Sequence, residues 1–445
     1  MYSYSHHKTT GLLWHKDEIP DTWSEVPFFT VFSENRFRNT LGLEQNLLSL
    51  SFGKIVRKDI NSADGLLPEN FNGYQIVEPR DLVFRLTDLQ NDKRSLRSAI
   101  VHERGIITSA YLGVRPLRGY PSYWNYLFRT YDVMKTFYSM GGGLRQSMKY
   151  EDMKRLPVIN PPLEEQRQIA TYLNRETAKI DKLIAKQQKL IKLLQEKRQA
   201  VISQAVTRGV NPNVKMKDSG VDWLGDVPEH WTAGSLRWYV KIRSGDFIAN
   251  TEFDSNQLRP CEVIGGNGVS GYTEIFNVSK AIVVGRVGAL CGNVHILSKP
   301  SWVTDNALIL EFSNKLHDDY AAEYLRCLDL NKLANKNAQP LITGSMIKSQ
   351  RCLIPPLSEQ RLISKKVDQT YHQFEYLAER AEDSIRLLKE YRQALITAAV
   401  TGKIDVRGLV TDEEVAALDA DPVLEATEED FESEVAEADY ITEEE

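Results

Sequence analysis

The chain contains the stretch PPLEEQRQIATYLNRETAKIDKLIAKQQKLIKLLQEKRQAVISQAVT at residues 161–207 and repeats it in altered form as PPLSEQRLISKKVDQTYHQFEYLAERAEDSIRLLKEYRQALITAAVT at residues 355–401. One constant offset aligns the two copies from Pro161 and Pro355 to their last residues without a gap. Self-similarity at a fixed spacing indicates an internal duplication. We therefore expect the two copies to form equivalent elements, around which the rest of the chain is arranged.

Each copy has the composition of one long helix. A Pro-Pro pair opens it, where a missing N–H does no harm, and acidic residues such as Glu165 and Glu359 follow in the first turn, where the positive helix end favours them. Neither Gly nor Pro interrupts the rest of either copy, and Gly209 and Gly402 follow as candidate C-terminal caps. About 40 residues at ~1.5 Å per residue would give a rod of about 60 Å.

Apolar residues recur in both copies at the heptad spacing of coiled-coil helices. A domain-sized segment lies between the copies, and the two ends of a domain are often close together. The second helix should then run back along the first, as an antiparallel pair with an approximate two-fold axis. The residues expected to hold this spacer together are Ile180, Leu183, Leu190, Leu194, Phe374, Leu377 and Leu388.

Two globular segments are predicted, one before the first helix and one between the helices. A short marker opens each of them, IPDTW at residues 19–23 and VPEHW at residues 227–231. Short β-like runs alternate with polar turns in the first segment, and Asn-Gly and Val-rich runs indicate strands in the second. The sequence predicts an α+β protein: two mixed α/β domains joined by two long antiparallel helices, which form a coiled-coil spacer with pseudo-two-fold symmetry.

The charge of the chain is divided unevenly. The net charge is −6, but residues 411–445 contain sixteen Asp and Glu and no Lys or Arg, so residues 1–410 carry +10. A positively charged folded part suits a polyanionic partner, although an excess of basic surface side chains without a binding role would give the same net charge. The acidic tail has few large apolar residues and is expected to be disordered.

The sequence shows no membrane-spanning stretch and no signal peptide at Met1, so we expect a cytoplasmic protein. Its four cysteines form no CxxC pair, so packing roles are expected for them rather than a zinc site or disulfides. The sequence has no GxxxxGK(S/T) loop, so ATP hydrolysis is not expected. The four cysteines are Cys261, Cys291, Cys327 and Cys352.

The doubled PPLxEQR helix, the RQA near each helix end, the two markers and the Gly-Arg-Val-Gly-Ala strand resemble the specificity (S) subunit, HsdS, of type I restriction-modification systems. The resemblance covers residues 12–408 and leaves the acidic tail outside it. The duplicated helices are its specific part, because the target-recognition segments vary widely within that family.

The resemblance implies a division of the chain into five parts. These are target-recognition domain 1 (residues 1–160), spacer helix 1 (161–208), target-recognition domain 2 (209–354), spacer helix 2 (355–408) and the acidic tail (409–445). Each domain would read one half of a bipartite, asymmetric DNA site. The subunit would be non-catalytic and hold no cofactor. Two methyltransferase (M) subunits and two restriction/translocase (R) subunits would supply the S-adenosylmethionine, ATP and Mg²⁺ chemistry of adenine methylation and restriction.

Arg and Asn side chains suit base reading because each forms two hydrogen bonds with one base edge. Candidates for DNA binding are Arg94, Arg97, Arg145 and Gln146 in domain 1 and Asn267, Arg286 and Asn293 in domain 2. Structural roles, such as a connecting loop or a salt-bridged strand end, stay open for them. The repeated residues near the helix ends are expected to face the methyltransferase subunits, with solvated helix surface as the alternative: Glu196, Arg198, Gln199, Glu390, Arg392 and Gln393.

Two other functions fit parts of the sequence. The stretch NPPL at residues 160–163 resembles the NPP(F/Y/W) motif of amino-methyltransferases, but Leu163 replaces the aromatic residue and the second copy has Ile354 in place of Asn. A coiled-coil adaptor with two protein-binding heads would suit the heptads and the acidic tail, but not the basic remainder. The sequence shows neither the DNA site and its spacer length nor the role of the tail.

Overall fold

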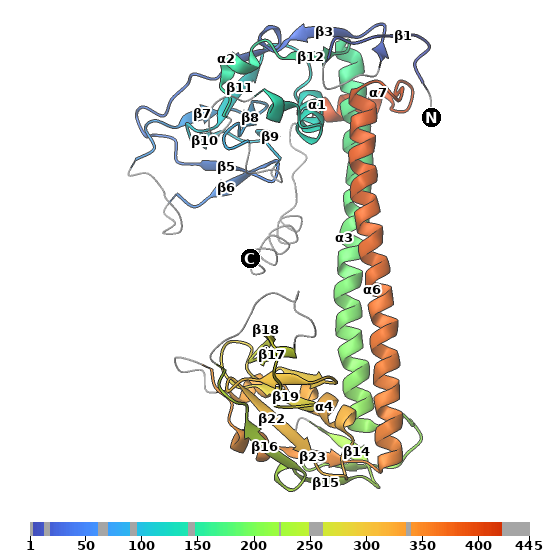
Figure 1. Ribbon diagram of the computed structural model, residues 1–445. Coiled ribbons are helices and arrows are strands. Elements are labelled where there is room, and N and C mark those ends of the chain that lie inside the picture. The colour runs from blue at the N-terminus through green and yellow to red at the C-terminus, as the bar shows by residue number, and fades with distance from the viewer. Residues whose placement is uncertain are drawn as a thin grey trace. The chain divides into compact units, whose positions relative to one another are not determined.

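The computed structural model describes residues 3–12, 18–60, 70–89, 96–140, 147–221, 224–248, 261–334 and 340–420. The chain divides into two units (Figure 1). Unit 1 comprises residues 1–187 and 383–445, and unit 2 comprises residues 188–382. Each of the two long helices, α3 (Leu163–Arg208) and α6 (Leu357–Val400), contributes one part to each unit.

Unit 1 is built from two four-stranded sheets and short helices. Its elements are β1 (His7–Lys8), β2 (Ile19–Pro20), β3 (Ser24–Pro27), η1 (Phe28–Thr30), β4 (Phe32–Glu34), β5 (Leu47–Ser51), β6 (Lys54–Lys58), β7 (Gln75–Val77), β8 (Leu82–Phe84), β9 (Ser98–Ile100), β10 (Gly105–Ile107), β11 (Leu112–Pro116), α1 (Pro121–Val133), η2 (Thr136–Ser139), α2 (Tyr150–Met153), β12 (Pro157–Asn160) and, after α6, α7 (Asp412–Ala420). The first sheet, in the order β4-β11-β8-β9, is antiparallel. The second sheet, β6-β5-β10-β7, contains one parallel pair, β5 with β10.

Unit 2 is built in the same way. Its elements are β13 (Met216–Asp218), β14 (Asp226–Pro228), β15 (Thr232–Ser235), η3 (Leu236–Trp238), β16 (Val240–Ser244), β17 (Cys261–Gly265), β18 (Gly268–Thr273), β19 (Ala281–Gly285), β20 (Val294–Leu297), β21 (Ser301–Val303), β22 (Ala307–Phe312), α4 (Asp318–Cys327), η4 (Leu330–Leu333), α5 (Gly344–Lys348) and β23 (Arg351–Ile354). Its sheets have the orders β16-β22-β19-β20 and β18-β17-β21, and β17 and β21 are parallel.

The two units share one topology. Taken in chain order, β4, β8, β9 and β11 correspond to β16, β19, β20 and β22, and both sets form the same strand order. The parallel pair β5 and β10 corresponds to β17 and β21, and β7 corresponds to the isolated antiparallel bridge between Val278 and Ser301. The sequence shows duplication only in the markers and the helices. The structure extends the duplication to the globular segments.

Within each unit the two helical segments lie side by side and run antiparallel (Figure 1). In unit 1, α3 begins and α6 ends at the first marker: Glu165 accepts a hydrogen bond from Trp23, and a Cβ on Gly402 would lie 3.3 Å from the ring of Trp23. In unit 2, α3 ends at the second marker, where a Cβ on Gly209 would lie 3.2 Å from the ring of Trp231. The predicted α+β class, with long antiparallel helices, is confirmed.

Both glycines act as the predicted C-terminal caps. Gly209 has φ +80° and Gly402 has φ +75°, the left-handed region that glycine enters at low cost. In unit 1 the core gathers aromatic rings between the first sheet and α1, among them Phe28, Phe84 and Phe128, all fully buried. Over the described residues, the structure contains no helix with the length and apolar character that a membrane crossing needs.

Candidate functional site

The glutamates of the repeated EQR sequence fix each long helix to its domain. In unit 1, Nε1 of Trp23 donates a hydrogen bond to Oε2 of Glu165 at 2.8 Å, and the hydroxyl of Tyr4 donates to the same oxygen at 3.0 Å. In unit 2, Nε1 of Trp231 donates to Oε2 of Glu359 at 2.7 Å. From the sequence, these glutamates are expected only to favour the helix start. The signal it missed is that both markers end in Trp.

The glutamines that follow are buried and hold the helix start from two sides. Nε2 of Gln166 donates to the carbonyl oxygen of Pro161, and Nε2 of Gln360 donates to that of Pro355, both at 2.8 Å. Their Oε1 atoms accept a backbone N–H from the residue that precedes α1 (2.8 Å) and from the residue that precedes α4 (2.7 Å). The repeated motif therefore joins the domain helix, the last strand and the spacer helix into one rigid connection.

The packing stripe of the spacer agrees with the prediction at four positions and differs at three. Ile180 is 5% exposed, and the other inward-facing predicted residues are partly buried: Leu194, Phe374 and Leu388. Leu183, Leu190 and Leu377 are 40–46% exposed, so their assignment to the stripe is wrong. In a heptad, the next inward-facing residue after Ile180 can lie three or four residues later in the chain. In the structure it lies four residues later, at Ile184. The inward-facing residues are therefore Ile184, Ile191 and Ala378, each of which directly follows a residue that the sequence predicts for the stripe.

In unit 1 the repeated residues near the end of α6 contact other residues of the spacer. Nε and an Nη atom of Arg392 donate to the two carboxylate oxygens of Asp181 on α3, at 2.8 Å and 3.2 Å. Glu390 accepts a hydrogen bond from Arg386 at 3.3 Å, and the amide of Gln393 reaches a hydroxyl one turn later. Arg392 thus has a structural role between the two helices, and Glu390 and Arg386 remain on the exposed side.

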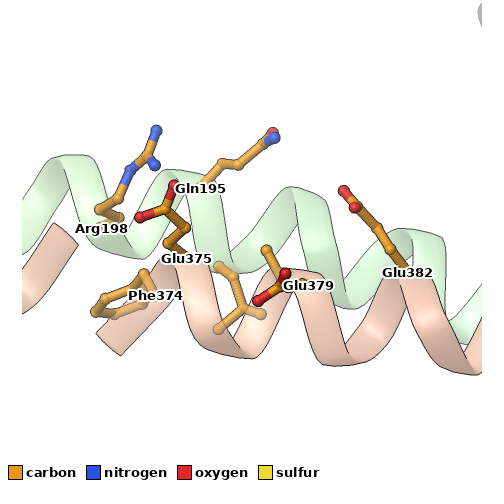
Figure 2. A pocket seen from close by; sticks show the side chains of 8 residues that line it. Gln195, Arg198, Phe374, Glu375, Glu379 and Glu382 are labelled. Atoms are coloured by element: carbon orange, nitrogen blue, oxygen red, sulfur yellow. The ribbon is translucent and has the colours of Figure 1, made fainter. Parts of the chain in front are cut away.

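In unit 2 the corresponding arginine has a different environment. The guanidinium of Arg198 lies over the ring of Tyr371 at 5.5 Å, and Glu196 and Gln199 are exposed on the same helix. Figure 2 shows Arg198 next to Glu375 at one end of a groove in this part of the spacer, with Glu379 and Glu382 further along α6. The groove is lined by Leu194, Gln195, Arg198, Phe374, Glu375, Ala378, Glu379 and Glu382.

The structure corrects one predicted DNA-binding residue in domain 1. Arg97 is fully buried, and its guanidinium donates to the backbone carbonyl oxygens of Arg85, Thr87 and Asp88 at 2.7–3.3 Å. A side chain enclosed in this way supports the loop after β8 and does not face a ligand. The other predicted residues of this domain lie outside the described residues: Arg94, Arg145 and Gln146.

The three predicted residues of domain 2 lie on adjoining loops. The side chains of Asn267 and Asn293 are exposed and share a hydrogen bond of 3.1 Å. Arg286, partly exposed, directly follows Gly285, at which a Cβ would lie only 2.0 Å from the carbonyl oxygen of Gly266. Only glycine permits this approach of the two loops. The result is a polar surface that carries one guanidinium and two amides, the groups that read base edges.

A histidine lies beside the same turn. Burial, with the nearby Arg326 as a smaller cause, lowers the pKa of His295, and a Cβ on Gly268 would lie 3.5 Å from its ring. The imidazole therefore stays neutral at neutral pH and does not add to the positive charge of this surface.

Cys352, which is buried, and Cys327, which is partly buried, are in environments that suit packing residues. Burial raises the pKa of Cys327 to about 11 and that of Cys352 to about 12, so both thiols stay protonated near neutral pH. Within the described ranges, no group of three His, Cys, Asp or Glu side chains is placed to hold a metal ion.

Comparisons with known proteins match this chain to specificity subunits of type I restriction enzymes. Residues 236–383 match the type I restriction modification DNA specificity domain. The specificity subunit of the type I restriction enzyme EcoprrI from Escherichia coli is 28% identical over 134 residues, which cover 29% of this chain and 33% of that protein. The MjaVIII specificity subunit from Methanocaldococcus jannaschii is 23% identical over 317 residues, 64% of this chain and 71% of that protein.

Solved structures show the same fold. The HsdS subunit from Thermoanaerobacter tengcongensis superimposes with a TM-score of 0.52 at 19% identity, over 87% of this chain and 98% of that one. A chain from a study of complex assembly in a type I R-M system gives a TM-score of 0.62 at 19% identity, over 87% and 99%. The fold is that of a two-domain specificity subunit with helical spacers. The chain is thus similar to type I restriction enzyme specificity subunits, in sequence to the relatives above and in fold to the HsdS structures.

Proposed function

We propose that this chain selects the DNA sequence for a type I restriction-modification complex. Each globular domain reads one half of a bipartite, asymmetric site, and the helical spacer sets the distance between the halves. The observation that carries this proposal is the duplication: two domains of one topology carry different side chains at corresponding places, as two different half-sites require. The match of residues 236–383 to a DNA specificity domain supports DNA as the ligand.

The charge distribution supports the same proposal. Residues 1–410 carry +10, and the acidic residues that reverse the sign of the whole chain are confined to residues 411–445. A cationic surface binds duplex DNA by neutralising phosphates and releasing their counterions. The adaptor alternative, with two protein-binding heads, does not require this charge.

Salt dependence of binding tests the proposal against the adaptor alternative. Affinity of the chain, in complex with its methyltransferase subunit, for duplex DNA should fall linearly on a log–log plot as salt rises, with a slope of about −0.9 for each phosphate neutralised. The methyltransferase subunit without this chain is the control. Binding that is equal with and without the chain would contradict the proposal and favour the adaptor.

The spacer is the proposed docking surface for two methyltransferase subunits, which two restriction/translocase subunits join in the full complex. These partners would hold S-adenosylmethionine, ATP and Mg²⁺ and carry out adenine methylation and restriction in the cytoplasm, while this chain takes no catalytic step. The exposed Glu196 and Gln199, with Arg198 between them, support docking in unit 2.

Co-purification tests the docking surface. Arg198→Glu should weaken capture of the methyltransferase subunit, because it reverses the one cationic side chain in a groove that otherwise holds three glutamates. Arg380→Glu makes the same charge change at an exposed position of α6 outside that groove and should leave capture unchanged. Equal capture by both variants would exclude this face of the spacer.

A further inference from the structure

The first strand of the antiparallel sheet leads, in both units, into a loop that displays a phenylalanine. Phe37 lies three residues beyond Glu34, the last residue of β4, and is 62% exposed. Phe247 lies three residues beyond Ser244, the last residue of β16, and is 75% exposed. A single exposed aromatic ring is common on a protein surface. Its recurrence after corresponding strands of two domains, whose other surface residues differ, points to a shared function.

The loop in unit 1 is firmly held, so the exposure of Phe37 does not come from a loose backbone. The backbone N–H of Phe37 donates to Oδ1 of the buried Asn35 at 3.0 Å, and its carbonyl oxygen accepts from the backbone N–H of Ile76 at 3.1 Å. Two residues later, the backbone N–H of Asn39 donates to the carbonyl oxygen of Tyr74 at 2.9 Å. The loop thus follows β7 and turns the phenylalanine ring outward.

The loop in unit 2 is held at the corresponding place. The backbone N–H of Asp246, the neighbour of Phe247, donates to the carbonyl oxygen of Val303 in β21 at 2.9 Å, and its carboxylate accepts from the amide of Asn277 at 2.9 Å. A Cβ on Gly245 would lie 2.2 Å from a backbone carbonyl oxygen, so only glycine fits at this contact. Asn277 precedes the bridge that corresponds to β7. Both phenylalanines therefore project from the seam between the two sheets of their domain.

Arginines lie beside the ring in unit 1 and near the start of the loop in unit 2. In unit 1 the guanidinium of Arg115 lies over the ring of Phe37 at 5.3 Å, and Arg36 and Arg38 are exposed on either side of it in the chain. In unit 2, Arg286 reaches the hydroxyl of Ser244, three residues before Phe247, at 3.4 Å. A rigid apolar ring among exposed guanidinium groups matches the surface of a nucleic-acid groove, where arginine meets phosphate and the ring meets apolar base edges. Two of the unit 1 arginines are also held by ion pairs within the domain, Arg36 with Glu34 at 2.9 Å and Arg115 with Asp81 at 3.1 Å.

We propose that Phe37 and Phe247 contact DNA, each laying its ring against a base edge of its own half-site while the adjacent arginines hold the phosphates. The ring suits the methyl group of thymine or the apolar edge of a base step. This inference rests on the proposed function, because it assigns residues to the DNA contact that the function requires. It also makes one prediction that the function alone does not: the two phenylalanines act on different halves of the site.

The test compares four single variants of the full chain, co-expressed with the methyltransferase subunit. Phe37→Ala and Phe247→Ala remove the proposed contacts. Phe29→Ala and Trp238→Ala are matched controls, because these aromatic side chains are 45% and 76% exposed in η1 and η3, at the other end of the same strands. The measurements are methylation mapping of cellular DNA, affinity of each complex for a duplex carrying the mapped site, and the unfolding midpoint.

We expect Phe37→Ala and Phe247→Ala each to lower the affinity about 10-fold and to relax base preference in one half-site, a different one for each variant. All four variants should keep the unfolding midpoint and the capture of the methyltransferase subunit. If the wild-type chain directs bipartite methylation but both phenylalanine variants bind and methylate like the controls, this inference fails alone. Loss of methyltransferase capture instead of DNA affinity would also overturn it. If the wild-type chain directs no methylation, the proposed function fails with it.

Discussion

Glu165 shows how much of this structure depends on single buried acceptors. It is 9% exposed, and one of its oxygens accepts hydrogen bonds from the fully buried Trp23 and from Tyr4. Burial and the neighbouring Glu165 raise the pKa of Tyr4, so its hydroxyl remains a donor. The carboxylate therefore connects the N-terminal segment, the marker and α3 at one point.

Replacement of this acceptor should destabilise unit 1. Glu165→Ala leaves the indole N–H of Trp23 and the hydroxyl of Tyr4 without their acceptor, at a cost of about 1–3 kcal/mol for each buried group, so the free energy of unfolding should fall by about 2–6 kcal/mol. Denaturant unfolding measures this change. Glu164→Ala, at a side chain that is 60% exposed one position earlier, should cost no more than about 0.5 kcal/mol. Equal losses for the two variants would contradict the role given to Glu165.

Residue chemistry alone did not separate structural from ligand-facing arginines. The basic residues around Arg97 predict a ligand surface, but the structure encloses Arg97 among backbone carbonyl oxygens. Burial depends on contacts between segments far apart in the chain, which residue type and spacing do not record. Asn267 and Asn293, by contrast, were predicted separately and are joined by a hydrogen bond, while their role in DNA binding stays a prediction.

At the scale of elements, the two long helices could be predicted almost completely. Their proline-rich starts, glycine caps and uninterrupted heptads are local signals, and α3 and α6 extend over 46 and 44 residues as the sequence indicates. The inward face could be predicted only in part. Leu183 and Ile184 are adjacent in the chain and both apolar. Which of them faces inward depends on the partner helix, and the spacing of residues in a single helix does not show this.

The packing stripe of unit 1 gives a direct test at this scale. Ile180→Ala should lower the free energy of unfolding by about 2–5 kcal/mol, because it removes a side chain that is 5% exposed and leaves a cavity between the helices. Leu183→Ala should change it by no more than about 0.5 kcal/mol, because that side chain is 46% exposed. Thermal or denaturant unfolding of both variants decides the register. A larger loss for Leu183→Ala would mean that the helices pair through the stripe expected from the sequence.

At the scale of the whole molecule, the duplication seen in the structure covers more of the chain than the duplication seen in the sequence. The segments between marker and helix differ in length and in most residues, yet β4-β11-β8-β9 and β16-β22-β19-β20 form the same sheet. Fold tolerates such divergence because a strand requires an apolar pattern and not particular residues. The side chains at the loops are free to differ between the two domains, as the proposed reading of two unlike half-sites requires.

The most direct test of this account is methylation mapping after a domain exchange. The chain, and a version whose residues 1–160 are replaced by the corresponding domain of another type I specificity subunit, would each be expressed with the same methyltransferase subunit, and long-read sequencing would locate the modified adenines. We predict a bipartite motif that depends on the chain, with one half changed by the exchange and the other half and the gap kept. A change in both halves, or methylation that does not depend on the chain, would contradict the account.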